Sequence, residues 1–266
     1  MDHKAGCNRA VLVSVAQFDY GVNLGKRPGV KRDDKKLHRI LRKLGFKVDI
    51  HNDLSSEEIY QLFYKESRRP VSDCFLAVLS SHGQEGCVFG ADGKPVWLSQ
   101  IFNYFDNKYM EKKAKLFLIQ ACRGDGVDDG VEVDSVNDTT DTSFSPYLSV
   151  PIDTAVMYAT APGYGAFTHP YGSVFLQTFC TLLEEEGNRN LELTRLMTRL
   201  CHRVAYTFQA KGAVFGGKKE MPCLMTRLTR DVFPFAEAGK DTGVSGLTAT
   251  SLIGPENIRK RSPSIS

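Results

Sequence analysis

The chain contains no apolar stretch long enough to cross a membrane, no Cys-x-x-Cys pair and no visible internal repeat. Without a long apolar stretch we expect no membrane-spanning segment and no membrane partner. The seven cysteines are odd in number, and none has the spacing to a histidine that is typical of a zinc site. We therefore predict no metal and no cofactor. Scattered cysteines without a disulfide framework favour a reducing, cytoplasmic compartment.

A strong excess of one charge is also absent. The 266 residues include 34 Lys and Arg and 31 Asp and Glu, which gives a net charge of +3. This balance argues against nucleic acid as the main partner. The most basic stretch, residues 31–43, is interrupted by Asp33 and Asp34 and has a helical spacing. We interpret it as the solvated face of a helix.

Short apolar runs alternate with amphipathic helical patterns along the chain. The apolar runs predict six strands, at 10–16, 46–50, 73–80, 116–120, 155–160 and 222–225. The helical patterns predict five helices, at 33–44, 55–69, 98–105, 175–182 and 193–208. Strands that alternate with helices are typical of an α/β fold with a parallel sheet.

Two of the predicted strands end in residues that can do chemistry. The run 116–120 leads into Cys122, and the run 73–80 leads into Ser81, His82 and Gly83. Parallel α/β sheets bind ligands beyond the carboxyl ends of their strands, so both side chains can meet at one rim. An imidazole beside a thiol promotes formation of the nucleophilic thiolate and can protonate a leaving amine. The N–H groups of Gly83 and Cys122 are candidate donors to a tetrahedral oxyanion.

The stretch from 123 to 151 has a different character. It is rich in Asp, Gly, Ser and Thr and lacks helical or strand periodicity, which predicts an exposed loop. A loop of this length inside an α/β domain is usually functional and accessible to proteases. The tail from about residue 238 is rich in Gly, Ser and Thr and then basic, so we predict that it is disordered.

Three motifs resemble those of the caspase family, most closely its executioner members. They are Ser81-His82-Gly83, Gln120-Ala121-Cys122-Arg123-Gly124 and Thr160-Ala161-Pro162-Gly163-Tyr164. The resemblance extends from about Asn8 to Phe235. It implies a mainly parallel six-stranded sheet with helices on both faces. It also implies a cysteine endopeptidase that cleaves proteins after aspartate in apoptosis, is made as a zymogen and acts as a homodimer.

The resemblance also implies a division of the chain and a set of partners. Residues 1–134 would form the large subunit, 135–153 a cleavable linker, 154–237 the small subunit and 238–266 the tail. Val131-Glu132-Val133-Asp134 before Ser135 looks like a caspase cleavage sequence, with Asp138 and Asp141 as secondary candidates. The expected partners are protein substrates with aspartate at P1, a second copy of the chain, and an upstream protease or an inhibitor.

Residue roles follow from the same resemblance. His82 and Cys122 would form the catalytic dyad, and Gly83 with Cys122 the oxyanion hole. Arg27, in Lys26-Arg27-Pro28-Gly29, and Gln120 would hold the P1 aspartate. A desolvated carboxylate is best held by the fork of a guanidinium group, which suits Arg27 to this role.

The chain departs from the family pattern in the substrate-binding segment. Thr168 stands where the family has a second arginine, and Phe167 stands in place of a tryptophan. Phe215 matches the second apolar wall for the P2 residue, so the P2 pocket should be wider than usual. A lost charge-assisted hydrogen bond costs about 1.5–3 kcal/mol, so Thr168 should weaken the binding of substrate.

Two other functions compete with an active aspartate-directed protease. One is a catalytically impaired homologue that regulates a related protease by dimerisation, and Thr168 favours it. The other is a related protease that cleaves after Arg or Lys. That specificity requires acidic residues in the P1 pocket, and Arg27 argues against it.

Overall fold

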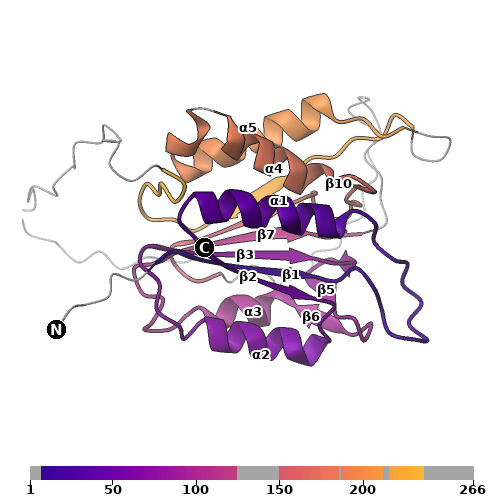
Figure 1. Cartoon of the computed structure of the whole chain (residues 1–266), viewed down its shortest axis with the longest axis horizontal. Helices are drawn as coiled ribbons and strands as arrows, with labels where there is room; N and C mark the ends of the chain where they lie inside the picture. The colour runs from indigo at the N-terminus through magenta and orange to yellow at the C-terminus, as the bar shows by residue number, and fades with distance from the viewer. Residues whose placement is uncertain (1–6, 125–149, 186, 212–215, 237–266) are drawn as a thin grey trace, which may run out of the picture.

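A six-stranded sheet forms the centre of the structure (Figure 1). The computed structural model describes residues 7–124, 150–185, 187–211 and 216–236. The strand order is β11-β8-β7-β3-β1-β2, and only β11 runs antiparallel to its neighbour. The expected α/β fold with a mainly parallel six-stranded sheet is therefore confirmed. The strands are β1 (Arg9–Ser14), β2 (Lys47–Asn52), β3 (Cys74–Ser80), β7 (Ala114–Gln120), β8 (Thr154–Tyr158) and β11 (Cys223–Thr226).

Helices cover both faces of this sheet, as expected (Figure 1). On one face lie α1 (Val30–Lys43), α4 (Val174–Glu184) and α5 (Leu193–Thr207). On the other face lie α2 (Ser56–Glu66) and α3 (Leu98–Tyr104). A short 3-10 helix, η1 (Asn188–Asn190), connects α4 to α5.

The apolar residues of each strand divide between two cores. In β7, Leu116 and Leu118 pack under α1, α4 and α5, whereas Phe117 and Ile119 pack towards α2 and α3. Successive side chains of a strand point to opposite faces, and both faces here are covered. A strand in such a sheet must therefore be apolar throughout, which explains why the runs could be recognised in the sequence.

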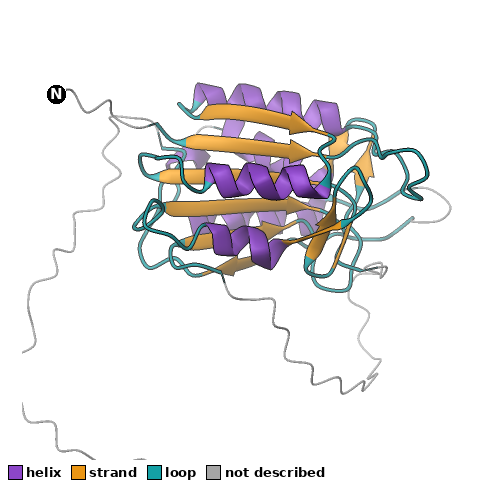
Figure 2. Cartoon of the chain, turned by 90° about the horizontal axis from the view of Figure 1, so that it is seen from below, coloured by secondary structure: helices purple, strands orange, loops and turns teal. Residues whose placement is uncertain are grey.

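Two small sheets complete the fold. The turn-rich region after β3 forms β4 (Gly83–Gln84), β5 (Cys87–Phe89) and β6 (Pro95–Trp97), and β9 (Thr168–His169) pairs with β10 (Gly172–Ser173). The parallel strands point their carboxyl ends towards one edge of the molecule, where the β4–β6 sheet also lies (Figure 2).

The first helix differs from the sequence-based expectation. It begins at Val30 rather than Asp33, because Gly29 adopts a left-handed conformation (φ 87°) that ends the preceding loop. A side chain at Gly29 would also collide with the backbone of the β9–β10 hairpin, since its Cβ would lie 2.1 Å from the oxygen of His169. Asp33 and Asp34, which interrupt the basic stretch, are buried.

Several expectations fall outside the described residues. They concern Phe215, the cleavage candidates Asp134, Asp138 and Asp141, most of the 135–153 linker and the 238–266 tail. Within the described ranges, no helix has the length and apolarity needed to cross a membrane, and no cluster of three or more His, Cys, Asp or Glu suitable for a metal ion is found.

Candidate active site

Cys122 lies two residues beyond the end of β7, in the middle of the sheet. Its side chain is half-buried. The N–H of Ala166 donates to the Cys122 sulfur at 3.4 Å, and the sulfur lies 3.9 Å from the Ala166 carbonyl oxygen. The segment that contains Phe167 and Thr168 therefore begins in contact with the sulfur.

Arg123 fixes the turn that carries this cysteine. Its guanidinium group binds both carboxylate oxygens of Glu85, at 3.1 and 2.7 Å, and stacks over the ring of Tyr158 at 4.1 Å. Its backbone N–H also donates to the carbonyl of Tyr164 at 2.9 Å. A nearly buried arginine with a bidentate partner is strongly oriented. Arg123 was not among the sequence-based site residues, although it is part of the Gln120–Gly124 motif.

His82 follows β3, which is the strand next to β7. Its Nε2 lies 2.8 Å from the carbonyl oxygen of Gly25, and its ring packs against Phe18 with a centroid distance of 5.4 Å. A carbonyl can only accept, so Nε2 carries the proton and the neutral ring offers Nδ1 as the base. Burial lowers the pKa of His82, and this effect favours the neutral base.

The described residues show no hydrogen bond between His82 and Cys122. The two strand ends are nevertheless adjacent, since Ser80 and Gln120 are partners in the β3–β7 register. Catalytic hydrogen bonds are often long in the absence of substrate. The expected dyad residues are therefore on neighbouring strands at one rim, with the imidazole oriented by Gly25, a residue that the sequence analysis missed.

Gly83 belongs to β4 and runs close to the cysteine turn. A Cβ at this position would lie 2.7 Å from the oxygen of Cys87, 2.9 Å from the Cβ of Ala121 and 3.1 Å from the oxygen of Cys122. No other residue type fits without movement of backbone. The close approach expected for a backbone oxyanion donor is present, while the donor role itself stays a prediction.

Arg27 is buried, with 6% of its surface exposed, in the loop between β1 and α1. It donates from Nη1 to the Val15 carbonyl at 2.8 Å and from Nη2 to the Ser80 hydroxyl at 2.9 Å. Burial lowers its pKa to about 10, and the negative charge of Asp33 opposes this shift. The guanidinium group remains charged at neutral pH, and only two of its N–H donors have acceptors among the described residues.

Gln120 belongs to a row of polar residues that includes Ser80, which binds this arginine. The last residues of β1, β3 and β7 are register partners: Ser14, Ser80 and Gln120. On each strand, the preceding residues of the same face are apolar. The Gln120 side chain is 1% exposed, yet neither its oxygen nor its nitrogen has a hydrogen-bond partner in the described structure. An unsatisfied buried amide is costly, so the amide is available for a ligand at this position.

The two positions that depart from the family pattern, Phe167 and Thr168, differ in exposure. Thr168 is exposed in β9, and Phe167 is half-buried with its ring 5.1 Å from that of Phe208. The N–H of Phe167 donates to Oε2 of Glu220 at 2.9 Å, while Oε1 of Glu220 has no partner among the described residues. Glu220 is 1% exposed, and burial raises its pKa to about 8. This carboxyl group could not be predicted from sequence, because it lies outside any periodic element, just before the short edge strand β11.

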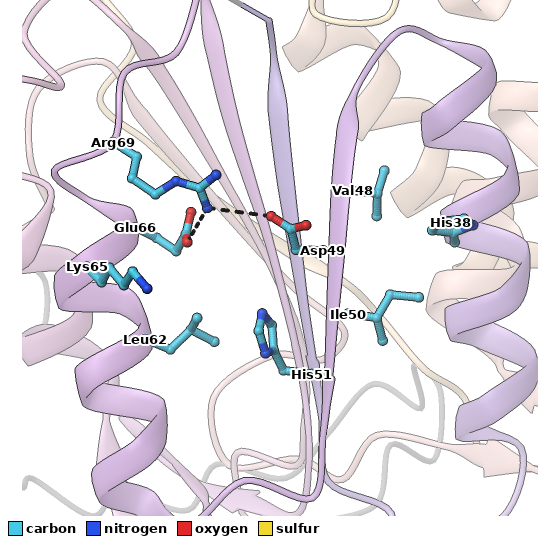
Figure 3. Close-up of a pocket in the computed structure, with 9 residues that line it drawn as sticks. All are labelled: His38, Val48, Asp49, Ile50, His51, Leu62, Lys65, Glu66 and Arg69. Carbon is cyan, nitrogen blue, oxygen red and sulfur yellow. Dashed lines mark hydrogen bonds and ion pairs between the residues drawn. The ribbon is translucent and has the colours of Figure 1, made fainter.

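Two surface hollows lie near the sheet, and only one of them includes a candidate residue. A hollow of about 650 Å³ is lined by the loop around Arg27 and by the start of α1. Another, of about 470 Å³, lies at the β2 edge between α1 and α2 and contains His51, Lys65 and the Asp49–Arg69 ion pair (Figure 3). None of the candidate site residues lines the second hollow, so it is separate from the proposed chemistry.

Residues 7–233 match the protein-family model described as "Caspase domain". The chain is 34% identical over 237 residues to caspase-7 of Gallus gallus, covering 85% of this chain and 76% of that protein. It is 34% identical over 231 residues to caspase-3 of Mesocricetus auratus, covering 84% and 82%. The crystal structure of caspase-1 from Spodoptera frugiperda superposes with a TM-score of 0.76 at 27% identity, covering 88% of this chain and 92% of that one.

The buried Glu220 predicts a specific pH dependence of stability. Its ordinary pKa is 4.5 and its folded pKa is about 8, so the folded protein retains a proton that the unfolded chain releases. The free energy of unfolding contributed by this group should fall as pH rises from about 4.5 to about 8. Glu220→Gln keeps an acceptor for Phe167 and removes the ionisation, so the variant should gain stability over the wild type across this range.

Urea unfolding at several pH values between about 5 and about 8 measures the effect. Glu111→Gln, at an exposed position, is the matched control. Parallel stability profiles for wild type and Glu220→Gln would contradict the prediction.

Proposed function

The chain belongs to the caspase family and is a cysteine endopeptidase, and from this premise we propose that it cleaves proteins after aspartate and acts in apoptosis in the cytoplasm. The observation that carries the aspartate specificity is that Arg27 binds the Ser80 hydroxyl while Gln120 is the register partner of Ser80 on the next strand. A buried guanidinium group and an unsatisfied buried amide lie at the carboxyl ends of adjacent strands, on the rim that carries Cys122. A carboxylate accepts from both groups, which makes an acidic P1 side chain the best fit.

The proposed reaction begins with proton transfer from the Cys122 thiol to His82. The thiolate attacks the carbonyl carbon of the P1 residue, and the N–H groups of Gly83 and Cys122 stabilise the oxyanion. His82 then protonates the leaving amine as the peptide bond breaks. Water, deprotonated by His82, hydrolyses the thioester and restores the thiol. Gly25 supports this role because its carbonyl holds Nε2–H and leaves Nδ1 to exchange the proton.

The proposed substrate pocket has one arginine, Arg27, where the family pattern has two. Arg27 and Gln120 lie on the buried side of the pocket, while Thr168 presents a short neutral side chain from an exposed strand. We expect Phe167 and Phe215 to form the apolar walls that receive the P2 residue. Thr168 should reduce the affinity for substrate without changing the preferred P1 residue, because the charge of Arg27 remains.

Activation by proteolysis and dimerisation are part of the same proposal. Residues 135–153 would be the linker between a large subunit (1–134) and a small subunit (154–237). The contact between Ala166 and the Cys122 sulfur supports latency, because a substrate carbonyl would have to displace this segment. The half-buried edge strand β11 supports a homodimer, since an apolar unpaired edge needs cover.

A panel of peptides that differ only at P1 tests the proposed specificity. The wild type should cleave the P1-Asp peptide far faster than peptides with P1 Asn, Glu, Lys or Arg, and Cys122→Ala should show no turnover. Labelling by a thiol-reactive peptide electrophile with P1 Asp reports the nucleophile independently. Neither labelling nor turnover would favour an impaired regulatory homologue, and preference for P1 Lys or Arg would favour the basic-specific alternative.

Restoring the second cationic arm should raise activity. Thr168→Arg places a guanidinium group at the edge of the pocket, and a gain of about 1.5–3 kcal/mol corresponds to about a 10-fold to 100-fold rise in kcat/KM for P1-Asp peptides. Thr168→Lys supplies the charge without the planar fork and should give a smaller gain. No increase in either variant would show that the arm is not limiting.

Cleavage after Asp134 should mature the enzyme. Asp134→Ala should block the main cut, and mass spectrometry should find a new amino terminus at Ser135 only in the wild type. Asp129→Ala, in the same acidic stretch, is the control and should still be cut. Two subunits with an intact Val133-Asp134-Ser135 junction would refute this site.

A further inference from the structure

A second buried carboxyl group lies behind the P1 arginine. Asp34, one turn into α1, is 6% exposed and accepts a hydrogen bond from the Ser14 hydroxyl at Oδ1, at 2.6 Å. Its other oxygen, Oδ2, has no partner among the described residues. Ser14 and Ser80 are register partners, and Ser80 holds the Arg27 guanidinium group. Asp34 and Arg27 are therefore bound to adjacent members of the same polar row.

The neighbouring Asp33 has a different and better-supported position. It accepts from the N–H of Ser173 at 2.9 Å and from the side-chain amide of Gln177 at 2.6 Å. These bonds compensate part of the cost of burying its charge. Asp34 has a single hydrogen bond, so its charged form is less well compensated. Of the two carboxyl groups beside Arg27, Asp34 is the one whose charge is easily lost.

The charged groups that act on Asp34 come from three elements. Asp33 lies on the same helix, Arg27 on the loop before it and Asp53 after β2, while Ser14 on β1 is neutral. Burial raises the pKa of Asp34 to about 6, the Ser14 hydrogen bond lowers it, and Asp33 raises it. Asp34 therefore changes charge around pH 6.

We propose that Asp34 is a positioning residue that sets how strongly Arg27 binds a P1 aspartate. When Asp34 is ionised, its negative charge offsets part of the positive potential of Arg27 and repels the P1 carboxylate of the substrate. When Asp34 is protonated, the positive field of Arg27 is available to the substrate. The charge of Asp34 is a larger fraction of the net charge around the pocket here because Thr168 supplies no second cation. This inference rests on the proposed aspartate specificity and extends it to a residue outside the pocket surface.

A ratio of two inactivation rates isolates this effect from the chemistry. Matched peptide electrophiles with P1 Asp and P1 Asn react with the same Cys122 and His82, so the titration of the dyad cancels in the ratio. The P1 aspartate itself, with an ordinary pKa of about 3.9, stays ionised above about pH 5.5. For the matured wild type, we expect the Asp/Asn ratio to fall about threefold to tenfold from about pH 5.5 to about pH 7.5, the size of a coupling of up to one pKa unit.

Two variants test the assignment from opposite directions. Asp34→Asn should keep the ratio high and independent of pH, and so raise it over the wild type at about pH 7.5. Ser14→Ala removes the hydrogen bond that favours the charged form, so the midpoint of the pH dependence should move upwards. Because Ser14→Ala retains Asp34, it tests the inference even where Asp34→Asn fails to fold.

Asp49→Asn is the matched control. Asp49 pairs with Arg69 on the α2 side of β2, away from the α1 side that holds Asp34 (Figure 3). This variant removes the same charge and should leave the ratio unchanged. A wild-type ratio that does not vary with pH, or that Asp34→Asn does not alter, would overturn the inference alone. Failure of the P1-Asp electrophile to react faster than the P1-Asn one at any pH would overturn the proposed specificity and the inference together.

Discussion

The burial of one guanidinium group constrains most of the site. Arg27 is held by the Val15 carbonyl and the Ser80 hydroxyl, so the loop before α1 is fixed to two neighbouring strands. The start of α1 is held from the other side, because Asp33 accepts from the N–H of Ser173 and Gly29 leaves no room for a side chain against His169. The Arg27 guanidinium group therefore lies where the amino-terminal strands meet the β9–β10 region. Its position depends on contacts from both parts of the chain.

The same loop also controls the base. Gly25 lies two residues before Arg27, and its carbonyl orients the imidazole of His82. In the proposed mechanism, the charge that binds substrate and the orientation of the base thus come from one segment that is anchored at Arg27. A change that loosened this loop would affect binding and chemistry together, whereas a change at Thr168 on β9 would act on binding alone. Variants in the Arg27 loop and variants at Thr168 should therefore have distinguishable effects.

Features that depend on a local pattern of residues, such as strands and their ends, could be predicted from the sequence. The apolar runs that are buried on both faces predicted the strands, and the strand ends placed His82 and Cys122 on one rim. Contacts between distant segments could not be predicted. Asp33 meets Ser173 across 140 positions, and Phe167 meets Glu220 across 53. Ser14 and Ser80 gave a weak signal, since each interrupts an apolar face at the end of its strand. The early start of α1 depended on the left-handed Gly29, whose conformation the helical spacing does not report.

Specificity for a carboxylate depends on the balance of buried charge around the pocket, beyond the single cation that touches the ligand. Here one buried arginine faces two buried aspartates on α1, and the position of a second arginine is taken by a threonine. In such a site, each buried carboxyl group makes up a larger fraction of the net charge near the ligand than it would beside two cations. Asp33 fixes α1 to β10 through its hydrogen bonds, and these bonds stabilise its charged form. Asp34 contributes one hydrogen bond to that structure, so the physical reason for a carboxyl group at this position is best sought in its effect on Arg27.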